Sequence, residues 1–543
     1  MQEVISSSTL VQTNGQVEEP GRRFRQLQAQ LRDRWQGIDY FDRDTYDILV
    51  VPSLSLDTRE LEKIKGIHHY EERLLFSVIR LRNPRTRLLY ITSQPIHPSI
   101  VDYYLQLIPG VPISHARDRL MMLSTYDSSM KPLTAKILER PRLVERLRQC
   151  LSPGQSYMTC FNSTPMERDL AVQLGVPLLG LDPDLLYWGT KAGSRQIFAE
   201  CEVPHPDGSD LVNTAQDLAT MTAELWERQP HLKRIVIKLN EGFSGEGNAL
   251  LDLAPLQSVA PGEASHRQRV DAICQQFEQL RFQAPCETWE NFRSRIGELG
   301  AIAEAFVEGD EKRSPSVQGR ITPAGEVEVI STHDQILGGP DGQIFLGCRF
   351  PADEAYRRQL QEWGRRVGEN LAAKGALERY SVDFIAVRRP GTENRWDMQA
   401  IEINLRKGGT THPFMTLKLL TNGRYDADSG LFFDHEGNPK YYIASDNLQK
   451  PSYRGLLPSD LMDIIAHHRL HFNSATETGT AFHLMGCLSE FGKLGLTSIG
   501  NSREQAEAIH NQVVRVLDEE TRHQHLNAPS PLSTPRITWN GQV

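Results

Sequence analysis

The sequence predicts a multidomain protein of mixed class, in which an α/β region is followed by α+β regions. At 543 residues the chain is long enough for about three or four domains. In the first third, short apolar runs alternate with helical patterns, which is typical of βαβ units and a parallel sheet. From Arg234 onward, β-like stretches are joined by turns that contain Gly and Pro, as in antiparallel hairpins.

The composition excludes several classes of protein. Lys and Arg total 60 against 69 Asp and Glu, so the formal net charge is −9 and no overall basic field attracts nucleic acid. No apolar run approaches the ~20 residues that span a bilayer, and the N-terminus lacks an apolar signal region. The seven cysteines are scattered, which favours a reducing compartment over a disulfide framework. We therefore expect a cytoplasmic protein without nucleic-acid or membrane partners.

The region 21–186 is expected to hold a helix and an open parallel sheet, after a disordered polar tail at 1–20. In 22–36, apolar residues recur at spacings of three and four, which predicts a helix with one packed face. The following pattern is Rossmann-like, but no GxGxxG motif follows a strand, so no nucleotide is assigned to this region. Strands are predicted at 46–51, 87–92, 157–161 and 176–179, and helices at 60–81, 140–151 and 165–174.

A glycine-rich loop follows an apolar strand that carries Lys238. The loop, 241–248, leads into a second strand at 249–253. Glycines let backbone N–H groups approach phosphate oxygens, and Lys238 would offer a charge to the same anion. Because the loop lies between two strands and opens no helix, we interpret it as a hairpin flap and not as a P-loop. An ordinary hairpin turn is the alternative for the loop taken alone.

The segments 381–387 and 398–404 are predicted to be the arms of an antiparallel hairpin. Glu402 and Asn404 are two residues apart and point to one face, and near-symmetric pairing brings Asp383 opposite them. Two carboxylates and an amide oxygen suit Mg²⁺, which shares its coordination shell with substrate phosphates. A solvated sheet face is the alternative for Asp383 alone, but a carboxylate set between two isoleucines favours a buried site.

Three further features accompany this hairpin. Arg406 continues the same face and could hold a transferring phosphoryl group, whereas an ion pair with Glu402 is the structural alternative. His412 precedes Pro413 and is expected to be a structural turn residue. The segment 303–312 is predicted to be a strand that breaks at a glycine, and an exposed strand edge followed by a carboxylate can bind an adenosine.

From about Tyr187 to Pro413, these motifs resemble the ATP-grasp superfamily in order and approximate spacing. Lys191, which precedes a helix, is similar to the first ATP lysine of that family, and Lys238 resembles the second. The resemblance implies ATP and Mg²⁺ or Mn²⁺ as cofactors. It implies further site residues: Gly242, Ser244, Gly245 and Gly247 in the flap, Glu304 to Val307 at the adenine, Glu311 at the ribose with Glu304 and Glu308 as competitors, and Asp383, Glu402 and Asn404 at the metal.

Within the superfamily, the phrases at 402–413 and 482–500 resemble the pheganomycin-type peptide ligases. These proteins carry a preceding α/β domain and a C-terminal extension. The resemblance implies six segments: a tail at 1–20, a helix and Rossmann-like pre-ATP-grasp domain at 21–186, a first ATP-grasp lobe with an insertion at 187–303, a second lobe with the metal site at 304–413, a C-terminal extension at 414–526, and a disordered tail at 527–543.

The extension at 414–526 is expected to fold and to enclose substrate or support the architecture. Ser502 and a glutamine three residues later form a capping-box spacing, which predicts the start of the last helix. Strands at 480–488 and 494–499 are predicted to pair as a hairpin around Gly492. In the region after Arg234, the Pro-, Ser- and Gly-rich stretch 254–268 is expected to be a loop.

The resemblance implies an ATP-dependent ligase. A carboxylate would attack the γ-phosphorus of ATP to form an acyl phosphate, and an amine would then displace phosphate to give an amide or peptide bond. Small-molecule carboxylates and amines, such as amino acids or peptides, are the implied partners. A phosphotransferase on the same fold and a non-catalytic ATP-binding scaffold are the alternatives. The sequence leaves open the identity of both substrates and whether the chain forms a homo-oligomer.

Overall fold

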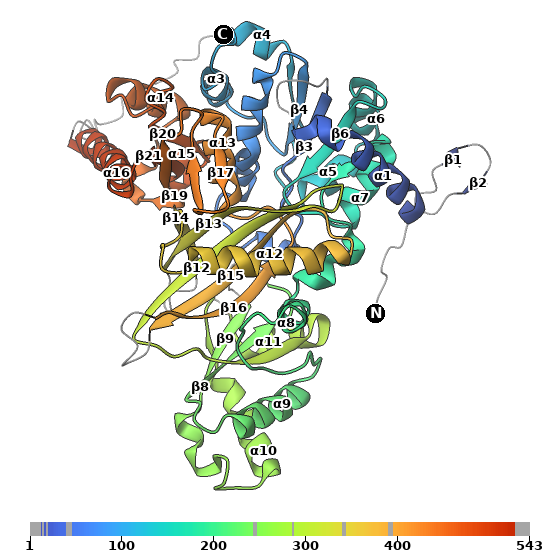
Figure 1. Ribbon diagram of the computed structural model, residues 1–543, viewed down its shortest axis with the longest axis vertical. Helices are drawn as coiled ribbons and strands as arrows, with labels where there is room; N and C mark the ends of the chain where they lie inside the picture. Colours follow the sequence, from blue (N-terminus) through green and yellow to red (C-terminus); the bar gives the residue numbers. More distant parts are fainter. Residues whose placement is uncertain are drawn as a thin grey trace, which may run out of the picture.

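The computed structural model describes residues 12–13, 16–17, 20–39, 46–242, 247–284, 287–338, 344–388 and 395–526. Three large sheets organise this part of the chain, one of them parallel and two antiparallel. In Figure 1 the parallel sheet lies at the top, the largest sheet at the centre and the smallest at the bottom. Every helix among these residues is too short or too polar to cross a membrane.

The N-terminal region forms a five-stranded parallel sheet with the strand order β5-β4-β3-β6-β7. Counted along the chain, this is third, second, first, fourth and fifth, which matches the first five strands of the Rossmann order 3-2-1-4-5-6. The predicted α/β fold of this region is therefore confirmed. Its strands are β3 (Tyr46–Val51), β4 (Thr86–Thr92), β5 (Leu120–Ser124), β6 (Ser156–Cys160) and β7 (Leu178–Leu179). Its helices are α1 (Pro20–Asp39), α2 (Thr58–Leu61), η1 (Ile67–Arg82), α3 (Pro98–Gln106), α4 (Ile113–Arg117), α5 (Leu133–Leu138), α6 (Pro141–Cys150), α7 (Pro165–Leu174) and η2 (Pro183–Gly189).

Two details of this region differ from the sequence prediction. The helix expected at 60–81 is divided into the short α2 and a 3₁₀ helix, η1, because Gly66 between them has a left-handed backbone (φ 73°). A Cβ at this position would lie 2.4 Å from Sγ of Cys487, so the close approach also requires glycine. The strand β5 was not predicted, since its sequence, LMMLS, contains no β-branched residue.

The smaller antiparallel sheet has the order β10-β9-β8-β11. Strands β8 and β9 pair from Arg234 opposite Asp252 to Lys238 opposite Asn248, so the predicted hairpin is confirmed. The tip of its loop, 243–246, with Ser244 and Gly245, lies outside the described residues. The strands are β8 (Arg234–Leu239), β9 (Asn248–Asp252), β10 (Arg281–Phe282) and β11 (Ala301–Ala305). The helices are α8 (Lys191–Glu200), α9 (Ala215–Arg228), η3 (Ala254–Val259), α10 (His266–Gln276), η4 (Phe277–Gln279) and α11 (Trp289–Leu299).

The prediction of an irregular loop at 254–268 is wrong. A 3₁₀ helix, η3, forms at its start, and α10 begins at His266. The reason is a capping box, in which Ser265 and Gln268 satisfy each other's backbone N–H groups. This cap outweighs the Pro- and Gly-rich composition of the preceding residues.

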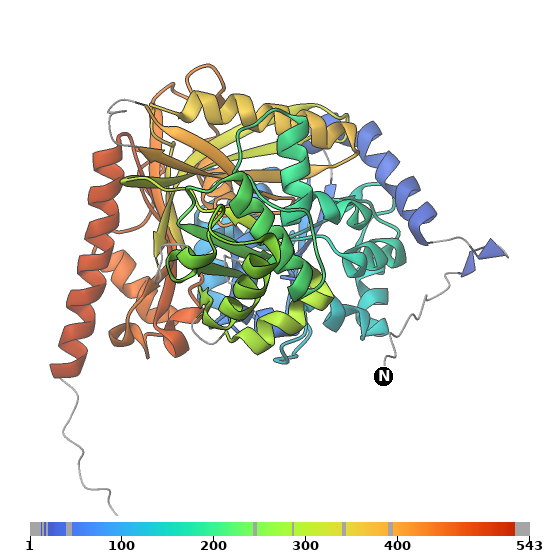
Figure 2. The ribbon, with the colours of Figure 1, turned by 90° about the horizontal axis from the view of Figure 1, so that it is seen from below.

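The largest sheet has ten strands and runs from the β15–β16 hairpin into the C-terminal region. Its main path is β16-β15-β12-β13-β14-β19-β18-β17, and β21 pairs with both β19 and β20. The helix α12 lies across its face (Figure 1), and Figure 2 shows α16 along one side with α1 on the opposite side. The strands are β12 (Glu311–Ile321), β13 (Val327–Gly338), β14 (Ile344–Phe350), β15 (Glu378–Arg388), β16 (Asp397–Asn404), β17 (Arg424–Asp426), β18 (Leu431–Phe433), β19 (Pro439–Gln449), β20 (Gly479–His483) and β21 (Lys493–Gly500). The helices are α12 (Arg357–Ala373), α13 (Thr411–Thr421), η5 (Pro451–Tyr453), α14 (Pro458–His467), α15 (Cys487–Phe491) and α16 (Arg503–Leu526). A separate two-stranded sheet is formed by β1 (Gln12–Thr13) and β2 (Gln16–Val17).

The predicted C-terminal hairpin is confirmed as a pair but is shorter than expected. Strand β20 ends at His483, because Leu484 has a left-handed backbone (φ 53°), and 487–491 forms α15 instead of strand. The last helix begins as predicted: Ser502 Oγ accepts a hydrogen bond from the backbone N–H of Gln505 at 3.1 Å.

One apolar core joins the N-terminal region to the C-terminal strands. The backbone of Phe482 in β20 is held on both sides: its N–H donates to Tyr103 Oη, and its C=O accepts from Tyr104 Oη, each at 3.0 Å. Both tyrosines come from α3 and are buried. Segments that are several hundred residues apart are therefore fixed against each other.

Candidate active site

A cavity of about 1150 Å³ lies where the three sheets meet. It exceeds the ~300–1,000 Å³ of a pocket for one small ligand, so it has room for a nucleotide and a second molecule. Its wall includes Tyr70 and Arg73 from η1, Lys238 and Glu304 from β8 and β11, Gln335, Asp383, Glu402 and Asn404 from the large sheet, Arg406, and Asn447 and Lys493 from the C-terminal strands.

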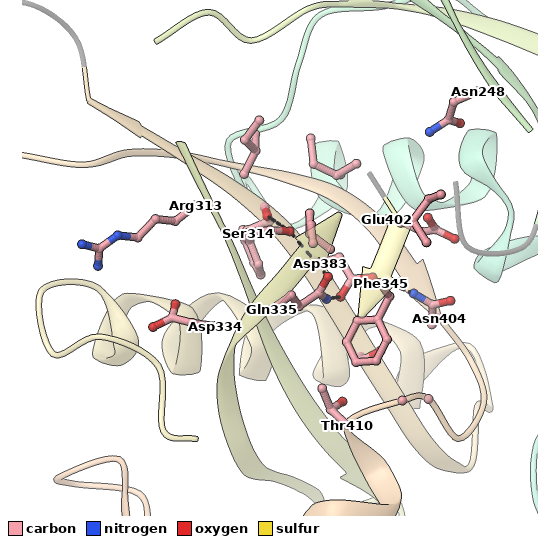
Figure 3. A pocket seen from close by; sticks show the side chains of 18 of the residues that line it. Asn248, Arg313, Ser314, Asp334, Gln335, Phe345, Asp383, Glu402, Asn404 and Thr410 are labelled. Atoms are coloured by element: carbon pink, nitrogen blue, oxygen red, sulfur yellow. Dashed lines mark hydrogen bonds between the residues drawn. The ribbon is translucent and has the colours of Figure 1, made fainter. Parts of the chain in front are cut away.

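The predicted acidic cluster is brought together by strands β15 and β16. Asp383 stands opposite Glu402 in the register of this antiparallel pair. Asp383 accepts hydrogen bonds from Gln335 Nε2 at 2.7 Å and from Asn404 Nδ2 at 3.0 Å (Figure 3). Since the amide of Asn404 uses its NH₂ on Asp383, its carbonyl oxygen is left for another partner. The expected convergence of these side chains is confirmed, while their role as metal ligands stays a prediction.

The electrostatics of this cluster favour a cation. Burial raises the pKa of Asp383 to about 7, and the nearby Glu402 carboxylate adds to the rise. Arg406 and Lys191 lower that pKa but do not cancel the shift. A buried carboxylate with a second carboxylate beside it is stabilised in its charged form when another cation binds, which is the chemistry of a divalent metal site.

Lys191 lies beside the same cluster, at the first position of α8. Its Nζ is 2.7 Å from Oε1 of Glu402, and its side chain is buried. Thr190 caps the helix by accepting from the N–H of Gly193, and Asn240 Oδ1 accepts from the N–H of Ala192 at 3.0 Å. The helix start that carries Lys191 is therefore tied to the end of β8.

Lys238 and Glu304 form a buried ion pair across β8 and β11. Arg195 Nη1 is a second, more distant partner of Glu304, at 3.4 Å. Because the carboxylate of Glu304 is already engaged by cations, it holds Lys238 in place at the cavity wall. Glu304 is thus next to Lys238 in the cavity, and its contact with adenine stays a prediction.

Of the other residues predicted to bind the nucleotide, some line the cavity and some do not. Val307 lines the cavity, after Phe306 at the end of β11. Glu308 pairs with Arg234 at 3.0 Å, and Glu311 pairs with Arg388 at 3.0 Å. Neither carboxylate is among the described residues that line the cavity. Two glycines of the predicted flap, Gly242 and Gly247, lie close together at the base of the loop. A Cβ added at Gly242 would be 3.4 Å from the Cα of Gly247.

Arg406 lies in the cavity wall, two residues after β16 ends at Asn404. Burial lowers the pKa of its guanidinium, and the carboxylates of Glu402 and Asp383 oppose that shift. The next residue, Lys407, turns away: its Nζ donates to the C=O of Cys160 at 2.7 Å. The turn after β16 therefore presents one cation to the cavity and uses the other to attach the N-terminal region.

A second wall of the cavity was not predicted. Arg73 lies over the ring of Tyr70, 4.2 Å from its centroid, and Arg73 Nη2 is 2.7 Å from Oδ2 of Asp446. Lys493 Nζ donates to Tyr70 Oη at 2.6 Å. We call these three residues, Tyr70, Arg73 and Lys493, the cationic wall. Because Tyr70 and Lys493 are 423 residues apart, no local sequence pattern indicates that they meet.

The interpretation of His412 as a turn residue is wrong. His412 is buried in the first turn of α13, and its Nε2 is 2.8 Å from Oδ1 of Asp446. A proline in the first helical turn costs little, since the N–H it lacks has no partner within the helix. Pro413 is therefore compatible with a helix at this position.

Comparison with known proteins agrees with this architecture. A family model described as "IQCH-like, ATP-grasp" matches residues 185–273 and 264–428, and one described as "PGM1 C-terminal domain" matches 460–513. The biotin carboxylase of Campylobacter jejuni has a similar fold, with a TM-score of 0.51 at 12% identity over 86% of this chain and 90% of that one. The fold and site thus define an ATP-grasp enzyme.

Two curated relatives narrow the class. The L-propargylglycine--L-glutamate ligase of Streptantibioticus cattleyicolor is 30% identical over 467 residues, which cover 84% of this chain and 91% of the relative. The IQ motif-containing protein H of Danio rerio is 24% identical over 72% of this chain and 40% of the relative. The chain therefore belongs to the ATP-grasp superfamily, and within it to the ligases that resemble the pheganomycin type. It is a ligase of the ATP-grasp superfamily.

Proposed function

We propose that this enzyme joins two small amino acids through an acyl phosphate, with ATP and Mg²⁺ bound at the β15–β16 hairpin. The observation that carries the proposal is the convergence of Asp383, Glu402 and Asn404 with Lys191 at a cavity large enough for a nucleotide and a substrate. The name of the S. cattleyicolor relative gives an amino-acid pair as its substrates, which supports the same substrate class here. We also propose a cytoplasmic location and small-molecule partners.

The donor set at the hairpin fits Mg²⁺, or Mn²⁺ in its place. Asp383, Glu402 and the carbonyl of Asn404 supply hard oxygen ligands on one face of the sheet. When bound, the metal neutralises charge on the phosphate oxygens and orients the γ-phosphoryl group. Gln335 comes from β13, which is separated from β15 by β12. Its amide fixes the carboxylate of Asp383, as outer partners of metal ligands do.

The remaining residues of the site have separate roles in the proposal. Lys191 and Lys238 contact the phosphates, and the backbone from Glu304 to Val307 contacts adenine. Glu311 is the candidate for the ribose, with Glu304 and Glu308 as its competitors. The flap, with Gly242, Ser244, Gly245 and Gly247, covers the phosphates and keeps water from the acyl phosphate. Arg406 is the catalytic cation that stabilises the phosphoryl group during transfer. The lobes of the ATP-grasp fold are proposed at 187–303 and 304–413, between the domain at 21–186 and the extension at 414–526.

The cationic wall is proposed to bind the carboxylate of an amino-acid substrate. Arg73 and Lys493 both line the cavity and both lie beside the ring of Tyr70, and Arg73 is paired with Asp446. A carboxylate bound here would gain charge-assisted hydrogen bonds from a guanidinium and an ammonium group.

A product assay tests the proposed function. Purified enzyme with ATP and Mg²⁺ is given L-glutamate together with each of the other common amino acids, and ADP, phosphate and the joined product are measured by chromatography and mass spectrometry. The expected result is ADP release that depends on both substrates and a product with the mass of the two amino acids less water. A stable phosphorylated product would instead identify a phosphotransferase, and nucleotide binding without turnover on any pair would contradict the proposal.

A further inference from the structure

A buried histidine–carboxylate cluster lies behind the cationic wall. His412 comes from α13, Asp446 from β19 and His483 from β20, and all three side chains are at most 6% exposed. Nε2 of His412 and Nε2 of His483 are 2.8 and 2.7 Å from the same oxygen, Asp446 Oδ1. The two ring nitrogens are 3.1 Å apart. Three donor atoms from three separate elements thus face one point.

Hydrogen bonds alone account poorly for this arrangement. If both imidazoles carry their proton on Nε2, two N–H groups converge on one carboxylate oxygen and their hydrogens crowd each other. If one imidazole carries its proton on Nδ1, its Nε2 lone pair faces a carboxylate oxygen, which is repulsive. For His412 such a proton would have no acceptor, because its buried Nδ1 lacks a hydrogen-bond partner among the described residues. A cation between the three donors removes the conflict, since every lone pair then points at it.

We propose that His412, Asp446 and His483 bind one divalent transition-metal ion, with Zn²⁺ as the best fit. Two imidazole nitrogens and one carboxylate oxygen are typical ligands of this ion, whereas Mg²⁺ prefers oxygen alone. Ligand bonds of about 2.0–2.2 Å place neighbouring atoms of a tetrahedral site about 3.3 Å apart. The observed separations of 2.7 to 3.1 Å need only a small outward movement to admit the ion.

The surroundings of the cluster support a metal site. Arg73 contacts the outer oxygen of Asp446 and leaves Oδ1 to the two histidines, which is how outer partners orient a ligating carboxylate. Gly495 on β21 makes room for the imidazole of His483, because a Cβ there would lie 2.2 Å from its Nε2. The ion would join α13, β19 and β20 directly behind the cavity, where Asn447 and Arg73 form part of the wall. We infer a structural ion that holds the cationic wall in place.

Metal content tests this inference independently of ligase activity. The full chain, free of any tag, is equilibrated with ZnSO₄, exchanged into metal-free buffer and analysed by plasma mass spectrometry. We expect about one zinc ion per chain. His483→Gln and Asp446→Asn should each lower the retained zinc roughly tenfold or more. The control is His333→Gln, which alters another buried histidine. His333 Nε2 contacts Tyr442 Oη at 2.6 Å, and His333 belongs to no metal-ligand cluster among the described residues. This variant should retain the zinc of the unaltered chain.

Two outcomes would overturn the proposal. One is an unaltered chain that retains no stoichiometric zinc after equilibration. The other is His483→Gln or Asp446→Asn protein, folded by circular dichroism, that retains as much zinc as the unaltered chain. Should both variants fail to fold, Co²⁺ added to the unaltered chain gives a second measurement. Visible absorption of a four-coordinate nitrogen- and oxygen-bound cobalt is expected, and the spectrum of aqueous Co²⁺ would count against the site.

Discussion

Two walls of one cavity have opposite chemistry. The β15–β16 wall presents two carboxylates, with lysine and arginine as their neighbours, and suits a metal and phosphates. The cationic wall presents a guanidinium and an ammonium group around one tyrosine ring, and suits a carboxylate. The first wall lies in the ATP-grasp match, whereas the second is built by η1 and β21, which lie outside that match. In the proposed function, carboxylate activation and substrate selection therefore belong to different parts of the chain.

The largest effect is expected at the β15–β16 wall. Glu402→Ala removes a proposed metal ligand and the partner of Lys191, so kcat should fall on the order of 10³-fold, which corresponds to several kcal/mol of transition-state stabilisation. Steady-state ADP release measures it. Glu362→Ala, on the exposed face of α12, is the matched control and should leave kcat unchanged. Equal kcat values for the Glu402 variant and the control would show that the β15–β16 wall does not take part in the reaction.

The next effect concerns the buried ion pair of Lys238 and Glu304 in the cavity wall. Lys238→Ala leaves Glu304 as a buried charge without its closest partner, so the free energy of unfolding should fall by about 3–5 kcal/mol, in addition to weaker ATP binding. Chemical denaturation measures the loss. The double variant Lys238→Met with Glu304→Gln removes both charges and should recover most of the stability. A Lys238→Ala protein as stable as the unaltered chain would show that the pair contributes nothing.

The cationic wall should respond in substrate affinity instead of turnover. Lys493→Met removes the ammonium group beside Tyr70, so the KM for the carboxylate-bearing amino acid should rise roughly tenfold, with kcat and the KM for ATP little changed. Lys450→Met is a matched control, since Lys450 also lies over a tyrosine ring, that of Tyr453, but is not among the described residues that line the cavity. A fall in kcat alone would assign the cationic wall to catalysis and break the division between the walls.

The smallest effect is expected at the helix that presents Lys191. Thr190→Ala removes the N-cap of α8 and should lower the free energy of unfolding by about 1 kcal/mol. Thermal unfolding measures this change, and Thr190→Ser, which keeps the capping hydroxyl, should restore it. A serine variant as unstable as the alanine variant would show that the hydroxyl does not cap the helix.

The predictability of the two walls differs for a physical reason. Asp383, Glu402 and Asn404 share one hairpin, so the period-two geometry of strands suffices to place them together. Lys238 and the loop that follows it are also local, and the antiparallel pairing of β8 and β9 confirms the predicted hairpin, while the role of the loop as a flap stays a prediction. Tyr70 and Lys493 meet only because α3 and β20 are packed in one apolar core, and no local pattern carries that information.

Local backbone and cap geometry explains the other differences from the sequence prediction. Gly66 and Leu484 adopt left-handed backbone conformations. Gly66 interrupts the predicted helix just before η1, and Leu484 follows the last residue of β20. The residues at 254–268 form helix because of one capping box. His412 was expected in a turn, but a proline in the first turn of a helix costs little free energy, so Pro413 allows α13 to form. Asp446 and His483 reach His412 only through the tertiary fold.

The most direct test of the account is a crystal structure with Mn²⁺ and a non-hydrolysable ATP analogue, in which the anomalous signal of manganese locates the metal. The account predicts manganese bound by Asp383, Glu402 and Asn404, with Lys191 and Lys238 on the phosphates of the analogue. Manganese and triphosphate located elsewhere in the cavity, with those three side chains directed away from them, would contradict it.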